Sequence, residues 1–159
     1  MYDFRIEAAD KATLYRDLAS ALEGLIAGEP DPIANMANAA SLIFETLPDV
    51  NWAGFYRNVG EELVLGPFQG RPACIRIRFG EGVCGTAAET RQVQRVEDVN
   101  AFPGHIACDS ASNSEIVVPL VRDGELLGVL DIDSPKVARF TEEDEAGFVR
   151  LGEILARVL

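Results

Sequence analysis

Basic side chains are scarce in this sequence. Lysine and arginine total 14 against 26 aspartates and glutamates, which gives a formal net charge of -12 at pH 7. Nucleic-acid binding needs a basic surface for the phosphate backbone, and anionic membranes attract basic segments. The charge balance therefore argues against a nucleic-acid partner and against an anionic membrane surface.

Long apolar runs are also missing. No stretch approaches the roughly 20 apolar residues that a membrane-spanning helix needs. Residues 1–10 contain neither the apolar core nor the basic flank of a secretory signal. We therefore expect a cytoplasmic protein with no membrane partner.

Histidine and cysteine are few, and their spacing restricts the chemistry. The histidine is His105, and the cysteines are Cys74, Cys84 and Cys108. Structural zinc sites usually contain a closely spaced cysteine pair, which this sequence lacks, so we expect no metal. A cytosolic chain also rarely builds a structural disulfide framework. The glycine-rich stretch G-E-G-V-C-G, residues 80–85, is not a phosphate loop because no Lys-Ser or Lys-Thr follows it.

The order of apolar patterns predicts an α+β fold. Apolar residues recur at helical spacing near both ends of the chain, and the region between alternates as strands do. We expect helices over residues 10–27, 31–47, 86–90 and from Thr141 onward, and strands over 51–57, 63–68, 74–79, 94–96, 116–121 and 126–130. This order is typical of an antiparallel sheet with helices packed mainly on one face. The length of 159 residues predicts a single domain, residues 1–159.

One predicted strand, residues 74–79, alternates clearly enough to assign its two faces. We expect Ile75, Ile77 and Phe79 to point inward. The outward positions are Cys74, Arg76 and Arg78. Further along, residues 97–113 form a long polar loop, and a loop of that length inside a domain is usually functional or disordered.

The two apolar runs 116–121 and 126–130 are joined by an Asp-Gly turn, which predicts a β-hairpin. Hairpin geometry places the start of the first strand opposite the end of the second. Glu115 therefore comes close to Asp131 and Asp133, and the loop that carries Cys108 enters at the same end. Three carboxylates in one place require a cation or a proton to balance them.

The residues alone leave the chemistry of this carboxylate trio open. It suits a hard cation, an ammonium group, or a proton donor with a raised pKa. Trp52 and Tyr56 lie on another strand of the same sheet. They are either core residues or a wall for a small apolar group.

The cysteines differ in their sequence surroundings. Cys84 and Cys108 lie among glycine, aspartate and serine, where packing explains them poorly, so redox or nucleophilic roles are favoured. Cys84 precedes the short predicted helix 86–90, and a helix N-terminus favours a thiolate. Cys74 fits a packing role better.

Two interpretations of His105 stay open. It lies three residues before Cys108, where it can activate the thiol, or it is a surface residue with local hydrogen bonds. Asp109 and the acidic trio act in the opposite direction, because negative charges raise the pKa of the Cys108 thiol.

Several motifs at these residues resemble the free methionine-R-sulfoxide reductases, which are single GAF-domain enzymes. The resemblance lies in H-I-A-C-D at 105–109, S-E-I-V-V-P-L at 114–120, D-G-E-L-L-G-V-L-D-I-D-S at 123–134, G-V-C-G-T-A-A at 82–88 and N-W-A-G-F-Y at 51–56. It extends from the second predicted helix to the last. GAF domains in general share the hairpin and D-I-D-S, but they do not share the three cysteines.

The resemblance implies a thiol-dependent reduction of free L-methionine (R)-S-oxide to L-methionine, without a cofactor. Cys108 matches the nucleophile, which would become a sulfenic acid. Cys84, with Cys74 as the second candidate, matches the cysteine that resolves it to an intramolecular disulfide. A thioredoxin-like dithiol would then reduce the disulfide.

The same resemblance implies roles for the pocket residues. Glu115, Asp131 and Asp133 match residues that bind the substrate ammonium and polarise or protonate the sulfoxide oxygen. Trp52 and Tyr56 match the wall around the methyl group.

The alternative function is a non-catalytic GAF module that binds a small ligand. Such a module has no need for Cys84 and Cys108. The fold class alone is compatible with a homodimer.

Overall fold

The computed structural model describes residues 6–106, 108 and 110–159. The helices are α1 (Lys11–Ile26), α2 (Pro32–Thr46), α3 (Gly82–Thr90), α4 (Glu142–Ala156) and the 3-10 turn η1 (Val99–Ala101). The strands are β1 (Trp52–Asn58), β2 (Glu62–Gly70), β3 (Arg76–Arg78), β4 (Gln94–Val96), β5 (Ser114–Arg122) and β6 (Glu125–Ser134). Among these residues, no helix is long and apolar enough to cross a membrane.

The strands form one antiparallel sheet in the order β3-β2-β1-β6-β5-β4. Hairpins join β1 to β2 and β5 to β6, as the sequence predicts, and β6 pairs with β1 at the centre. The predicted α+β class and antiparallel sheet are thus confirmed.

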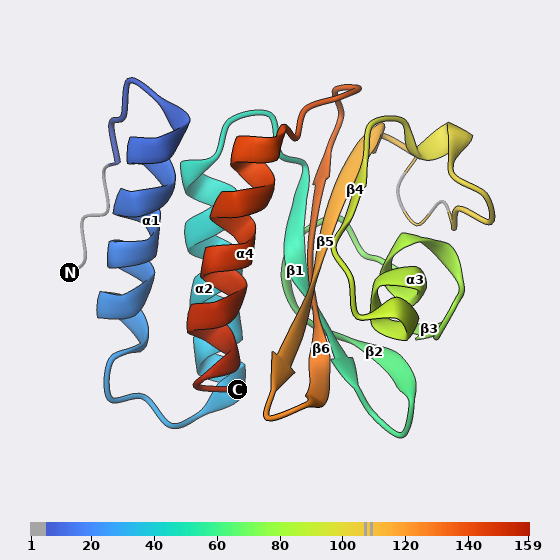
Figure 1. Cartoon of the computed structure of the whole chain (residues 1–159), viewed down its shortest axis with the longest axis horizontal. Coiled ribbons are helices and arrows are strands. Elements are labelled where there is room, and N and C mark those ends of the chain that lie inside the picture. Colours follow the sequence, from blue (N-terminus) through green and yellow to red (C-terminus); the bar gives the residue numbers. More distant parts are fainter. Residues whose placement is uncertain (1–5, 107, 109) are drawn as a thin grey trace.

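The layers of the molecule are visible in Figure 1. Helices α2 and α4 pack on one face of the sheet, and α1 packs against their outer side. The short helix α3 and the loops around it cover the opposite face. Helices therefore lie mainly on one face, which confirms the sequence prediction.

Alternating residues of the strands belong to two separate hydrophobic cores, one on each face of the sheet. On β1, Ala53 and Phe55 belong to the core under the long helices. Trp52 and Tyr56 on the same strand belong to the core under α3. This alternation follows from the two-residue period of a strand. As a result, Trp52 and Tyr56, two of the candidate functional residues, lie on the α3 face.

Helix starts agree with their capping signals. Asp10 and Asp31 cap α1 and α2 by accepting hydrogen bonds from Thr13 N and Ala34 N. The last helix has a capping box between Thr141 and Asp144.

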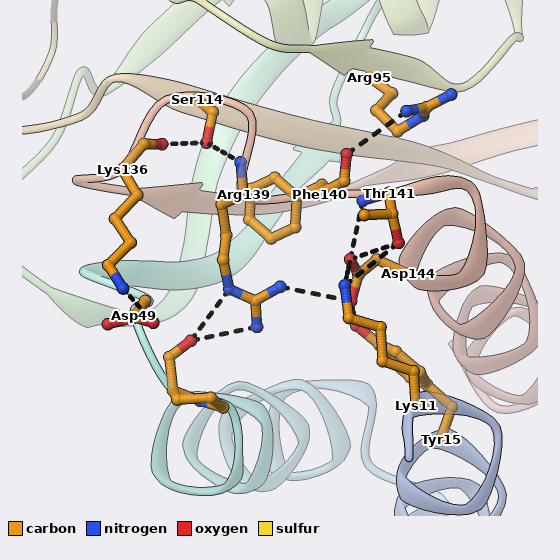
Figure 2. A network of polar contacts seen from close by, with 11 residues as sticks. Lys11, Tyr15, Asp49, Arg95, Ser114, Lys136, Arg139, Phe140, Thr141 and Asp144 are labelled. Atoms are coloured by element: carbon orange, nitrogen blue, oxygen red, sulfur yellow. Dashed lines mark hydrogen bonds and ion pairs between the residues drawn. The ribbon is translucent and has the colours of Figure 1, made fainter.

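Asp144 is also the centre of a polar network that ties α1 to α4 (Figure 2). Its carboxylate accepts from Lys11 Nζ at 2.6 Å, Tyr15 Oη at 2.7 Å and Arg139 at 3.3 Å, besides Thr141 N. Burial alone would raise the pKa of Asp144, but these donors outweigh it and lower the pKa to about 2. The network fixes the outer helix to the helix that lies on the sheet.

Two local predictions around β3 and α3 are wrong. Strand β3 contains only residues 76–78, so Ile75 precedes it and is 68 % exposed instead of pointing inward. Ile77 does point inward. Helix α3 begins at Gly82, four residues earlier than predicted, so Cys84 lies within its first turn.

Candidate active site

A narrow pocket opens on the α3 face of the sheet. Its cavity volume is about 40 Å³. Residues from β1, β3, β5, β6, α3 and three loops line it, among them Trp52, Tyr56, Cys84, Cys108, Glu115, Asp131 and Asp133. Of the predicted site residues, Cys74 is not in the lining, but it is bonded to Cys108, which is. The structure therefore brings the predicted set together.

Trp52 and Tyr56 form an aromatic wall on β1. Both are buried, and their stacked rings lie 6.0 Å apart. Trp52 Nε1 donates to Arg71 O at 3.1 Å, and Tyr56 Oη donates to Cys74 O at 2.9 Å. Since both polar tips are satisfied by the loop between β2 and β3, the ring faces offer the pocket an apolar surface.

The carboxylates come from the β5–β6 hairpin in the register that the sequence predicts. Glu115 pairs directly with Asp133, and Asp131 is two residues before Asp133 on the same face. Glu115 and Asp131 are buried, whereas Asp133 is half-buried. The hairpin thus places two carboxyl groups at the bottom of the pocket and one nearer its opening.

Cys84 lies against the two buried carboxyls. Its Sγ is 3.3 Å from Asp131 Oδ2 and 3.8 Å from Glu115 Oε1. Burial raises the pKa of the Cys84 thiol well above its ordinary value, and the charges of Asp131 and Glu115 raise it further. The predicted thiolate at the helix start is therefore wrong, because this environment outweighs the helix dipole.

Burial and mutual interaction also change the pKa values of the buried carboxyls. Burial raises the pKa of Glu115 well above its ordinary value, and the charges of Asp131 and Asp133 add to the effect. Burial raises the pKa of Asp131 as well. A carboxyl group that keeps its proton near neutral pH can act as a proton donor in the pocket.

A disulfide joins Cys74 to Cys108, with their Cα atoms 5.6 Å apart. Cys84 is the free cysteine. By resemblance, Cys84 was the first candidate for pairing with Cys108 and Cys74 the second, and the structure forms the second bond. The packing role predicted for Cys74 is incomplete, since this residue contacts the apolar core under α3 and also carries the disulfide.

His105 lines the pocket beside Cys108 and is half-buried. Burial lowers the pKa of His105, which favours the neutral imidazole. Asp109, the other residue expected to influence Cys108, lies outside the described residues.

Arg71, Glu81, Ile106 and Ser112 line the pocket and were not predicted from the sequence. They come from loops whose course depends on the tertiary fold. Ile106 lies within the H-I-A-C-D motif and Glu81 within the glycine-rich stretch, but neither pattern identifies these side chains as pocket residues.

Comparison with known proteins identifies the family of this chain. The family model for the GAF domain matches residues 34–159. The free methionine-R-sulfoxide reductase of Escherichia coli is 55% identical over 150 residues, which cover 94% of this chain and 91% of that protein. The enzyme of the same name from Saccharomyces cerevisiae is 45% identical, with 92% and 86% covered.

Among solved structures, the free methionine-R-sulfoxide reductase of Neisseria meningitidis in complex with its substrate superposes with a TM-score of 0.95. It is 46% identical, and the match covers 99% of this chain and 95% of that chain. The fold and the family match define a GAF-domain protein. Within that class, the chain belongs to the family of the free methionine-R-sulfoxide reductases.

Proposed function

We propose that this protein reduces free L-methionine (R)-S-oxide to L-methionine with its own thiols. The observation that carries the proposal is the disulfide between Cys74 and Cys108, with Cys108 in the lining of an acidic pocket. Such a bond is the expected end state of a thiol reductase that has acted once. Relatives named for this activity match nearly the whole chain and support the substrate assignment.

The reaction balances with two thiols. Cys108 attacks the sulfoxide sulfur, methionine leaves, and the oxygen stays on Cys108 as a sulfenic acid. The Cys74 thiol then displaces water from that sulfenic acid and forms the disulfide. In sum, one sulfoxide and two thiols give one thioether, one disulfide and one water.

The pocket carboxyls interact with the sulfoxide oxygen and with the ammonium group of the substrate. Attack on sulfur is easier when the sulfoxide oxygen is protonated, and Glu115, with its raised pKa, is the proton donor that we assign. Asp131 and Asp133 attract the ammonium group of a free amino acid. Trp52 and Tyr56 enclose the methyl group.

Cys84 takes a different role from the one first expected. Its thiol is engaged with Asp131 and Glu115 at the pocket floor, and it is free while Cys74 and Cys108 are bonded. We therefore assign the resolving role to Cys74 and a substrate-facing role to Cys84.

A thioredoxin-like dithiol returns the oxidised enzyme to its reduced form. This exchange fits a cytoplasmic location, where such reductants keep thiols reduced. Homodimer formation stays a prediction from the fold class, and the single domain over residues 1–159 stays a prediction from the chain length.

A thiol count on a single turnover tests the proposal. Fully reduced, desalted protein is mixed with free methionine (R)-S-oxide in the absence of reductant. We expect one methionine released per chain, loss of two of the three thiols, and a Cys74–Cys108 peptide by mass spectrometry. The (S)-epimer is the control and should leave all thiols intact. Binding of the (R)-epimer without loss of thiols would instead favour a ligand-binding module.

A further inference from the structure

Three potential metal ligands meet at the pocket floor. One ligand atom each from Cys84, Glu115 and Asp131 lies within 4.8 Å of the other two, and all three residues are buried. The set combines one sulfur with two carboxylate oxygens. In the proposed reduction, no step requires the Cys84 thiol to change its oxidation state.

One oxygen of this cluster depends on a shared proton. Asp131 is 5 % exposed, and its Oδ1 accepts no hydrogen bond from the described residues when Glu115 is ionised. A protonated Glu115 can donate to the Asp131 carboxylate. The other oxygen, Oδ2, is the one that faces Cys84. Within the described part of the chain, none of the ion pairs involves Asp131 or Glu115. A buried carboxylate oxygen without a donor is unfavourable, so a cation can take the place of the shared proton.

The spacing of the ligand atoms fits a tetrahedral ion. With a zinc–sulfur bond of about 2.3 Å and a zinc–oxygen bond of about 2.0 Å, tetrahedral angles place sulfur and oxygen about 3.5 Å apart. The observed distances from Cys84 Sγ are 3.3 Å to Asp131 Oδ2 and 3.8 Å to Glu115 Oε1. Both sulfur–oxygen distances are therefore within a few tenths of an ångström of those in a tetrahedral zinc site.

The ligand types decide which cation is favoured. Mg²⁺ and Ca²⁺ prefer oxygen ligands alone and larger coordination numbers, so the thiolate disfavours them. Zn²⁺ accepts thiolate and carboxylate together, and three protein ligands leave its fourth position open. Binding releases the protons of Cys84 and Glu115, and the ion neutralises two of the three negative charges of the deprotonated set.

We propose that Cys84, Glu115 and Asp131 form an inhibitory Zn²⁺ site at the floor of the pocket. The inhibitory consequence rests on the proposed function, whereas the binding site does not. Zinc would occupy the carboxyl oxygens that the proposed function assigns to the substrate, so the two cannot use these oxygens together. Zinc should therefore compete with the sulfoxide. Cys74 and Cys108 are not ligands, so their disulfide should not prevent metal binding.

The direct test uses the oxidised protein, in which Cys84 is the free thiol. Titration with Co²⁺, a spectroscopic substitute for zinc, should produce a thiolate-to-cobalt absorption band that saturates at a single equivalent. Zn²⁺ should abolish the band by displacement. Absence of the band in the oxidised wild-type protein would overturn the proposal.

Variants identify the ligands. Cys84→Ser should lose the band, and Glu115→Gln, which keeps the thiol, should weaken cobalt binding by about tenfold or more. Glu153→Gln, on the exposed surface of α4, is the matched control and should bind as the wild type does. If Cys84→Ser does not fold, the cobalt affinity of Glu115→Gln is the deciding measurement. A cobalt affinity equal to that of the wild type would overturn the assignment of Glu115 as a ligand.

A second measurement separates this proposal from the proposed function. In single turnovers of pre-reduced enzyme, Zn²⁺ should slow methionine release, and either excess sulfoxide or a chelator should restore it. An absorption band without any reductase activity would refute the proposed function alone. Full activity without an absorption band, and without zinc inhibition, would refute the zinc site alone.

Discussion

The Cys84 thiol donates to Asp131 Oδ2 across 3.3 Å, although Cys84 lies in the first turn of a helix. The hydrogen bond requires the thiol to keep its proton, and the carboxylate makes the thiolate less stable. Cys84, which is buried and keeps its proton, is therefore expected to react slowly as a nucleophile.

We accordingly predict that Cys84 in the oxidised protein reacts slowly with iodoacetamide at pH 7 to 8. Asp131→Asn should speed the reaction, because removal of the negative charge lowers the pKa of the thiol and increases the thiolate fraction. Alkylation followed by mass spectrometry measures both rates. The same sample in urea should react at an ordinary rate, and rapid alkylation of the native protein would contradict the prediction.

The three cysteine-to-serine variants should behave differently in a single turnover. Cys108→Ser should release no methionine, because a hydroxyl is a far weaker nucleophile at neutral pH. Cys74→Ser should release one methionine per chain and then stop with a sulfenic acid on Cys108. Cys84→Ser should still form the Cys74–Cys108 disulfide. If Cys84→Ser stops with a sulfenic acid on Cys108 while Cys74→Ser still forms a disulfide, Cys84 is the resolving cysteine.

The enzyme should discriminate strongly between free and N-acetylated methionine (R)-S-oxide. Acetylation replaces the ammonium by a neutral amide, which removes the attraction between the substrate charge and the pocket carboxylates. Loss of one partner of a buried ion pair typically costs about 3–5 kcal/mol, or roughly a hundredfold to several thousandfold in kcat/KM.

Steady-state assays with both substrates and excess dithiol measure this ratio. Asp133→Asn should reduce use of the free substrate and narrow the ratio, because it removes part of the attracting charge. Equal turnover of the two substrates in the wild type would mean that the acidic trio does not bind the ammonium group.

The Asp144 network should make stability depend on acidity. The pKa of Asp144 is about 2 in the folded protein, against 3.8 as its ordinary value. A lowered pKa means that the contribution, about 2 kcal/mol, is complete above pH 4 and is lost as the pH falls toward 2.

Asp144→Asn imitates the protonated residue and isolates this effect. The difference in unfolding free energy between wild type and variant should be largest near pH 7 and should shrink between about pH 4 and pH 2. Urea titrations at several pH values provide the measurement. A difference that does not depend on pH would show that the charge of Asp144 is not what stabilises the network.

Two helix glycines should respond in opposite directions to alanine. A Cβ on Gly147 in α4 would collide with the Tyr15 ring of α1, whereas a Cβ on Gly24 in α1 meets no atom within 4 Å. We expect Gly147→Ala to destabilise the fold by about 2 kcal/mol, because the interface between the helices cannot accept the methyl group. Gly24→Ala should stabilise it by roughly 1 kcal/mol through helix propensity. Thermal unfolding of both variants tests the pair.

The parts of the fold that the sequence predicts are those with local signals. The Asp31-Pro32 start of α2 and the capping box of Thr141 with Asp144 act within a few residues. The β5–β6 hairpin also follows from its own turn, so the proximity of Glu115 to Asp133 could be predicted from the residues alone.

Long-range packing determines what the sequence did not predict. Cys74 and Cys108 are 34 positions apart, and their contact depends on how two loops meet over the α3 face. The glycine-rich stretch before residue 86 resembles a turn, yet it begins helix α3. Gly85 fits there because any Cβ would collide with Arg78 O, so the glycine reflects close packing of the helix. Neither relationship has a periodic or local signal.

The two faces of β1 separate the pocket side from the core that the long helices cover. Ala53 and Phe55 are buried under the long helices, whereas Trp52 and Tyr56 belong to the pocket side. Descendants of this chain could therefore acquire a new ligand by changes at alternate positions of one strand while the helix-side core is inherited intact. One strand thus contributes to the helix-side core with one face and to the recognition surface with the other.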